Sequence, residues 1–245
     1  MIVMYDVWML GPLMIPVITV VVLLSVIGGL LYLRYLSPYK HKRDNQVRDL
    51  TANTVILTAV IYFFGSVPLN FSAFVNDPVS ILSYPSGQNE FFLAVTAAII
   101  YLVFKHSRQK VKVTDTLAGV FYVVLVADLL FAFAVTETGK PLEGGLSGLL
   151  PFTEHPVSLY TMGLSLILLI WLHYAGRLSD EPVKLMAMVP LWAAGKWVIS
   201  LTNQSAAFLT IYLEEHTYLV IAAGAVVASS IYYILRKKQV ILWKN

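Results

Sequence analysis

Two ionisable side chains lie deep within apolar stretches of the sequence that are long enough to cross a membrane. Asp128 stands in the run VVLVADLLFAF, and Lys196 stands in LWAAGKWVIS. A charged group is costly inside hydrocarbon, so it commonly marks a ligand site, a proton relay or an ion pair. Because an isolated buried charge is disfavoured, we expect Asp128 and Lys196 either to pair with each other or to serve a ligand or a proton directly.

A second group of polar residues stands at the ends of these apolar stretches. Glu137 closes the stretch that contains Asp128, and His155 and Tyr160 belong to the segment HPVSLY. A carboxylate, an imidazole and a phenol can all move protons in catalysis, although a histidine near an interface is more often a hydrogen-bonded structural residue. Trp192 and Trp197 flank Lys196, and tryptophans near a membrane surface usually form an aromatic belt. No histidine spacing matches a metal motif, so neither a metal nor a cofactor is expected.

The composition indicates a membrane protein. Of the 245 residues 58% are apolar and 13% are charged, whereas about 25% are charged in a typical soluble domain. The absence of cysteine excludes disulfides, thiolate nucleophiles and iron–sulfur clusters. The net charge of +3 without a single basic face does not favour a nucleic-acid partner. No Lys or Arg precedes the first apolar stretch, so we expect that stretch to be retained as a span rather than cleaved as a signal peptide.

Seven stretches approach the roughly 20 apolar residues that a spanning helix needs. They cover approximately residues 12–36, 52–71, 91–105, 117–136, 156–174, 183–202 and 218–235. The third stretch is short unless it begins before residue 91, and Pro68 and Pro190 fall inside the second and sixth. The sequence therefore predicts an all-α integral membrane protein with seven transmembrane helices in one polytopic domain, residues 1–245.

The charges predict the orientation of these spans. Fifteen of the 17 basic residues fall on alternate connections: Arg34, Lys40, Lys42, Arg43, Arg48, Lys105, Arg108, Lys110, Lys112, Arg177, Lys184, Arg236, Lys237, Lys238 and Lys244. The opposite connections carry Lys140 and most acids: Asp6, Asp77, Glu90, Glu137, Glu143, Glu154, Glu214 and Glu215. Basic loops stay in the cytoplasm, so we expect the N-terminus outside and the C-terminus inside.

Several short motifs resemble those of the bacterial prolipoprotein diacylglyceryl transferase family (Lgt). His155-Pro156-Val157-Ser158-Leu159-Tyr160 resembles the family signature HPSQLYE. Further similarities are Leu10-Gly11-Pro12 to the opening IGP, Asn76-Asp77-Pro78 to an NP or DP step, and Val113-Thr114-Asp115 to the start of the fourth main helix. The resemblance implies an Lgt-like bundle and transfer of a diacylglyceryl group from phosphatidylglycerol to a lipoprotein cysteine.

The residues that the family uses for this transfer are largely replaced. Aligning Phe133 and Glu137 with the signature RxGNFxNGE puts Leu129 at its arginine and Ala132 and Val135 at its asparagines. Lys196 replaces the arginine of the sixth helix, Ser200 a glutamate one turn later, and Glu154 the arginine before HPSQLYE. The family's HGG motif would fall within 86–92, where Phe92 takes the place of the histidine. Since arginine grips phosphate in two places, these losses predict the fold without the family's standard chemistry.

Three functions of different classes follow from these observations. The first is a degenerate Lgt-like protein of the bacterial cytoplasmic membrane that binds a membrane lipid, such as an anionic phospholipid, or a lipoprotein or other membrane-protein partner. The second is a divergent lipid transferase that uses Glu137, His155 and Tyr160. The third is a small transporter or channel component that uses Asp128 and Lys196.

Overall fold

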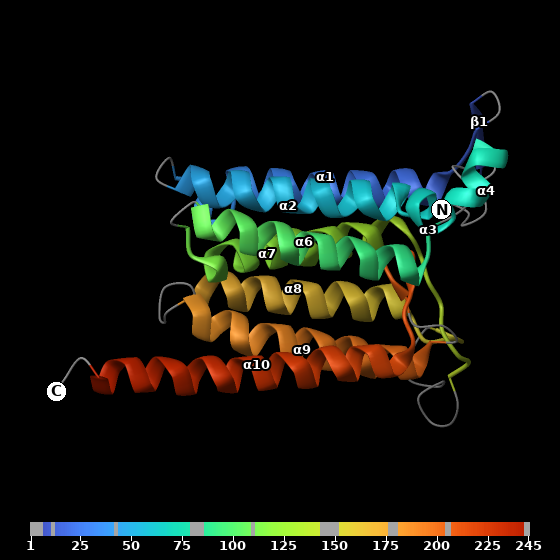
Figure 1. Ribbon diagram of the computed structural model, residues 1–245. Helices are drawn as coiled ribbons and strands as arrows, with labels where there is room; N and C mark the ends of the chain where they lie inside the picture. The colour runs from blue at the N-terminus through green and yellow to red at the C-terminus, as the bar shows by residue number, and fades with distance from the viewer. Residues whose placement is uncertain are drawn as a thin grey trace.

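The computed structural model consists mainly of long helices that lie side by side, with the chain termini at opposite ends of the bundle (Figure 1). It describes residues 7–10, 13–41, 44–78, 86–108, 111–142, 152–175, 181–203 and 207–242. Several residues used above lie outside these ranges: Asp6, Gly11, Pro12, Lys42, Arg43, Lys110, Glu143, Arg177 and Lys244.

The long helices within the described ranges are α1 (Val17–Tyr35), α2 (Asn45–Phe64), α6 (Gln88–Arg108), α7 (Val113–Ala134), α8 (Val157–Ala175), α9 (Glu181–Thr202) and α10 (Glu215–Leu242). A 3₁₀ turn, η1 (Pro38–Lys40), joins α1 to α2, and the short helices α3 (Ser66–Leu69) and α4 (Phe71–Asn76) follow α2. Two antiparallel hairpins complete the fold: β1 (Val7–Leu10) with β2 (Leu13–Pro16), and β3 (Ala207–Phe208) with β4 (Ile211–Tyr212).

Five of the helices are long and apolar enough to cross a membrane, as counted over the described residues: Val17–Tyr35, Asn45–Phe64, Gln88–His106, Val113–Ala134 and Val157–Tyr174. A spanning helix satisfies its backbone groups internally, which is why helices dominate a chain of this composition. The prediction of a mostly helical chain is confirmed, and the length and composition of these five helices are consistent with a membrane protein.

Helix α7 forms the centre of the bundle. It packs against α1, α2, α6, α8 and α9, and most of its side chains are buried. Apolar and small residues on nearly every side of α7 explain this position, because a helix that is apolar all round is stable only when other helices or lipid surround it. The outer helices then pack in pairs, α6 against α2 and α10 against α9.

Glycine permits the close approach of α1 to α7. A Cβ atom added to Gly29 would lie 2.7 Å from the backbone oxygen of Val123, closer than two such atoms can approach. Small residues at helix contacts are a common device for tight packing in membranes. Gly29 therefore sets how near α1 comes to the central helix.

The predicted ends of two spans are wrong. The second does not cover 52–71: α2 begins at Asn45 and ends at Phe64, so Pro68 lies in the separate helix α3 rather than inside a long one. The third is longer than 91–105, because α6 begins at Gln88. The carboxylate of Glu90 accepts hydrogen bonds from the Gly87 N–H (2.8 Å) and the Ser66 hydroxyl (3.0 Å), and these contacts hold polar residues within the first turn of α6.

Replacing Gly29 with alanine is expected to destabilise the protein. The added methyl group would overpack a contact made with the rigid backbone of α7, which typically costs about 1–3 kcal/mol. The thermal melting temperature of the purified protein in detergent should fall.

The matched control is Gly163→Ala in α8, where an added Cβ would meet no atom within 4 Å. This variant should melt at or above the wild-type temperature, because alanine favours helix more than glycine does. Equal melting temperatures for both variants would show that α1 does not depend on Gly29.

Candidate functional site

The two charges predicted deep in the spans meet in the interior of the bundle. The Nζ atom of Lys196 on α9 lies 2.8 Å from Oδ1 of Asp128 on α7. The second carboxylate oxygen, Oδ2, accepts a hydrogen bond of 3.0 Å from the Ser165 hydroxyl on α8. Asp128 is 1% exposed and Lys196 4% exposed. Both oxygens of the aspartate are thus satisfied by protein groups, which a buried ion pair requires to be stable.

The local sequence of α9 lets the lysine reach its partner. A Cβ added to Gly195 would lie 2.6 Å from a methyl carbon of Leu164, so the absence of a side chain there brings α9 close to α8. The neighbouring Ala193 is fully buried. The lysine ammonium also lies 5.8 Å from the ring centre of Phe208 in β3, within the range of a cation–π contact.

The turn of the β3–β4 hairpin reaches the same region. Leu209, at this turn, has a φ of 54°, a left-handed conformation that is unusual for a residue other than glycine. Its side chain lines a small cavity together with Asp128, Glu137 and Lys196. The hairpin therefore closes over the ion pair from the end of the bundle where α7 ends.

Glu137 lies just beyond α7 and approaches the ion pair from that end. Burial raises the pKa of its carboxyl group above the ordinary value of 4.5, the Lys196 ammonium lowers it, and Asp128 raises it; the net shift is upward. Ser158 positions this segment, because its hydroxyl accepts a hydrogen bond of 2.6 Å from the Glu137 N–H and donates one of 2.8 Å to the Val135 carbonyl.

Within the described residues, Glu137 lines three cavities. Two of them have volumes of about 10 Å³ each, and Lys196 lines both. Asp128 and Leu209 also line the first, and Ser200 and Tyr218 also line the second. A volume of roughly 10–15 Å³ holds one water molecule. The third cavity, of about 470 Å³, lies between the end of α7 and the start of α8.

His155 and Tyr160 form a separate pair. The Nδ1 atom of His155 is 3.3 Å from the Tyr160 hydroxyl, and the backbone of His155 pairs with Gly139 and Lys140. Glu137 faces Lys196 and Asp128 rather than these two side chains, since it lines both small cavities and neither His155 nor Tyr160 does. The three residues predicted for a divergent transferase thus fall into two groups.

Two residues of the site, Ser165 and Tyr218, were not predicted. Ser165 donates a hydrogen bond to the second carboxylate oxygen of Asp128, and Tyr218 is fully buried beside Lys196. The Tyr218 hydroxyl has no hydrogen-bond partner among the described residues. Serine in an apolar helix usually bonds its own backbone, and a tyrosine near a helix end resembles a belt residue, so neither gives a signal in the sequence.

Trp192 is not a belt residue. It is 8% exposed and packs edge-on against Phe208, with ring centres 5.4 Å apart, and also against Phe121 and Tyr218. It lies in the interior because the hairpin and the start of α10 cover its face of α9. The expectation for Trp192 is therefore corrected.

Apolar side chains take several positions at which the resembling family has polar residues. Ala132 and Val135 belong to the packed interior, Leu129 is half-buried, and Phe92 is exposed on α6. Lys196 is the cation that remains, and its ammonium is held by Asp128. No group of three or more metal-binding side chains occurs among the described residues.

Comparison of the sequence with models of known protein families gives no match, and comparison with curated proteins gives none. The family resemblance therefore rests on the motifs quoted above.

Loss of either member of the ion pair is expected to be strongly destabilising. Asp128→Asn and Lys196→Met each leave a buried charge without its partner, which typically costs about 3–5 kcal/mol. The double variant removes both charges and should recover part of that loss. Unfolding free energies of all four proteins in the same detergent measure the coupling.

Additive losses would show that the two groups do not stabilise each other. Lys140→Met provides the control, because the Lys140 ammonium is exposed and donates to the Leu201 carbonyl. That variant should show no coupling to Asp128→Asn.

Proposed function

We propose that this protein is a seven-span, Lgt-like protein of the bacterial cytoplasmic membrane that binds a membrane lipid or a lipid-bearing partner and does not transfer a diacylglyceryl group. The observation that carries the proposal is the ion pair that Lys196 forms with Asp128. This lysine stands where the resembling family has an arginine, and its ammonium is 2.8 Å from Asp128.

A phosphate group would have little to bind at this position. It would have to displace Asp128 from the lysine and would itself be repelled by that carboxylate. The spaces beside Lys196 measure about 10 Å³ each, which suits one water molecule. A phosphatidylglycerol headgroup is far larger, so the geometry favours a closed ion pair over a catalytic phosphate site.

The size and lining of the larger cavity support the binding of a lipid as the function of this protein. Its volume of about 470 Å³ lies within the common range for small-molecule sites, roughly 300–1,000 Å³. Its lining combines apolar side chains such as Phe133 and Leu159 with polar groups such as Glu137 and Thr136. This mixture suits an amphiphile better than a purely polar solute.

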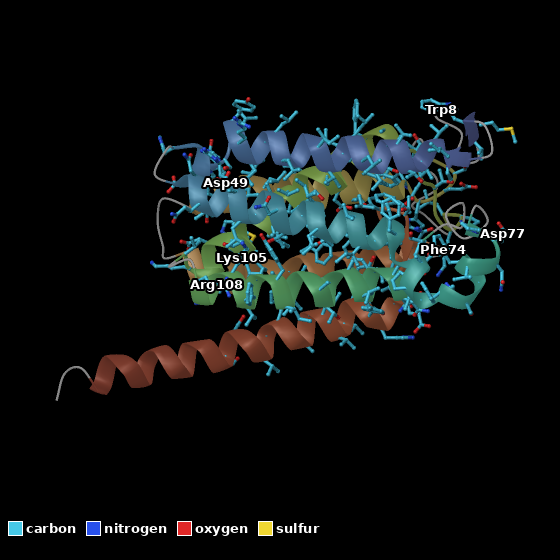
Figure 2. All side chains as sticks on the ribbon, turned by 45° about the horizontal axis from the view of Figure 1, so that its top comes forward. Trp8, Asp49, Phe74, Asp77, Lys105 and Arg108 are labelled. Atoms are coloured by element: carbon cyan, nitrogen blue, oxygen red, sulfur yellow. The ribbon has the colours of Figure 1, made fainter. Side chains whose placement is uncertain are left out.

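The proposed topology has all seven long helices crossing the membrane, with the N-terminus outside. The arrangement in Figure 2 supports this orientation: Lys105 and Arg108 lie at one end of the bundle, and Trp8, Phe74 and Asp77 lie at the other. Basic residues remain on the cytoplasmic side during insertion. Glu137 and the larger cavity would then lie at the outer face.

Single-cysteine labelling tests this orientation, since the natural chain has no cysteine. Cysteine is introduced at two exposed positions, as Thr138→Cys and His41→Cys. Thr138 lines the larger cavity, and His41 lies between α1 and α2 at the other end of the bundle. A membrane-impermeant maleimide should label Thr138→Cys in intact cells and His41→Cys only after the membrane is opened. The reverse pattern would contradict the proposed orientation, and the cysteine-free parent measures background labelling.

A transfer assay tests the proposed absence of catalysis. The purified protein, incubated with phosphatidylglycerol and a peptide carrying a lipobox cysteine, is expected to leave the thiol unmodified. Mass spectrometry of the peptide gives the readout, and an active enzyme of the resembling family provides the positive control. The chain should also fail to complement loss of that enzyme in cells.

Transfer of a diacylglyceryl group would overturn the proposal and favour the divergent transferase, in which Glu137, His155 and Tyr160 would be tested by substitution. Ion or solute flux in liposomes that is abolished by Asp128→Asn would instead favour the transporter.

A further inference from the structure

The larger cavity is built where α7 ends and α8 begins. It is lined by side chains from the end of α7, the connection that follows and the first turns of α8: Ala132, Phe133, Thr136, Glu137, Thr138, Phe152, Thr153, Glu154, Pro156, Ser158, Leu159 and Met162. The Ser158 hydroxyl accepts from the Glu137 N–H and donates to the Val135 carbonyl, and the Ser158 N–H donates to the Glu137 carbonyl, so these bonds hold the two sides together. The cavity is therefore part of the folded structure rather than a gap between separate segments.

Part of the lining belongs to the lipid-facing surface. Phe133 is 75% exposed and Leu159 53% exposed, and both lie on helices that are long and apolar enough to span a membrane. Large apolar side chains on such helices face lipid tails, where their exposure has no cost. A ligand can consequently reach the cavity from the membrane, which indicates an amphiphile.

The charge of the lining is negative. It contains the carboxylates of Glu137 and Glu154 and no Lys, Arg or His side chain. Neither of the two lysines in this part of the molecule lines the cavity: Lys196 donates to the Asp128 carboxylate, and Lys140 donates to the Leu201 carbonyl at the exposed surface. An anionic headgroup would meet two carboxylates in the lining.

Among the lining residues, the Glu137 carboxylate is the group that most needs a hydrogen-bond donor or a counter-ion. It is partly buried, and none of the described residues donates a hydrogen bond to its carboxylate. Lys196, the cation that lowers the pKa of Glu137, is already neutralised by Asp128. When all three groups are ionised, two carboxylates share one ammonium, so one negative charge remains uncompensated at the wall of the cavity. A carboxylate in this position is best satisfied by a cation that can also donate hydrogen bonds.

We propose that this cavity binds the protonated primary amine of a membrane lipid, with Glu137 as the counter-ion and the apolar part of the lipid along Phe133, Leu159 and Met162. The inference rests on the proposed function and specifies its ligand. It reverses the charge preference expected from the family resemblance, which is for an anionic phospholipid. A primary ammonium group offers three donors on one compact charge, and it fits a site whose acceptors are a carboxylate and hydroxyl oxygens.

Three single-chain amphiphiles of equal chain length test the charge preference: a primary alkylamine, the corresponding alcohol and the corresponding carboxylate. Each is titrated against the full-length protein in nanodiscs of phosphatidylcholine, and binding is read by native mass spectrometry. The amine should bind at one site per chain, about tenfold to a hundredfold more tightly than the carboxylate, the range expected for a charge-assisted hydrogen bond. The alcohol should lie between them.

Glu137→Gln tests the assigned counter-ion. The variant keeps the size of the side chain and should lose most of the preference for the amine over the alcohol while its affinity for the alcohol stays unchanged. Glu215→Gln is the matched control, because it removes the same charge from an exposed residue at the same end of the bundle that does not line the cavity. Thr138→Trp, at an exposed residue of the lining, should weaken all three amphiphiles by obstructing the cavity.

The possible outcomes separate this inference from the proposed function. Equal affinity for amine and carboxylate, or tighter binding of the carboxylate, would overturn the amine preference while leaving lipid binding intact. A preference for the amine that survives in Glu137→Gln would also overturn it, since the charge would then act elsewhere. If none of the amphiphiles binds, or if Thr138→Trp binds all of them as well as the wild type does, the cavity is not a lipid site and the proposed function fails with it. Melting temperatures near the wild-type value show that each variant is folded.

Discussion

The buried contact between Asp128 and Lys196 fixes the relation of three helices. The carboxylate on α7 receives Lys196 from α9 on one oxygen and Ser165 from α8 on the other. In a low-dielectric interior each of these contacts is strong when made and costly when broken, so small relative movements of the helices are penalised. Apolar packing alone leaves a helix in a membrane free to slide or rotate among similar arrangements. The ion pair selects one of them.

The same contact determines which chemistry the interior permits. An ammonium that is held at 2.8 Å by a buried carboxylate is not available to a second anion, and water-sized spaces beside it limit what else can enter. The interior is therefore a structural element, and the lipid binding that we propose is placed further out, in the larger cavity. Ser158 links the two regions, because it belongs to α8 and holds the backbone of Val135 and Glu137.

Hydropathy was sufficient to predict the helices and the position of both interior charges, but not their surroundings. Long apolar runs identify spans because the membrane fixes their length, whereas the ends depend on polar contacts between distant segments. Glu90 lies inside α6 because Ser66 and Gly87 bind its carboxylate. Trp192 is buried because a hairpin some residues later places Phe208 against it. Ser165 and Tyr218 belong to the site through the rotation of their helices, which no local pattern of the sequence encodes.

Glu137 connects the structural interior to the binding surface. Its carboxyl group lies close enough to Lys196 and Asp128 to be influenced by both, and it also forms part of the larger cavity. Burial raises the pKa of this carboxyl group because the ionised form loses its hydration there, and ionisation also adds a second negative charge beside a single ammonium. A proton and a cationic ligand relieve this imbalance in the same way, so they compete for one carboxylate. Because Asp128 already neutralises Lys196, the ion pair that closes the interior to phosphate leaves the Glu137 carboxylate free to select a cationic ligand in our proposal.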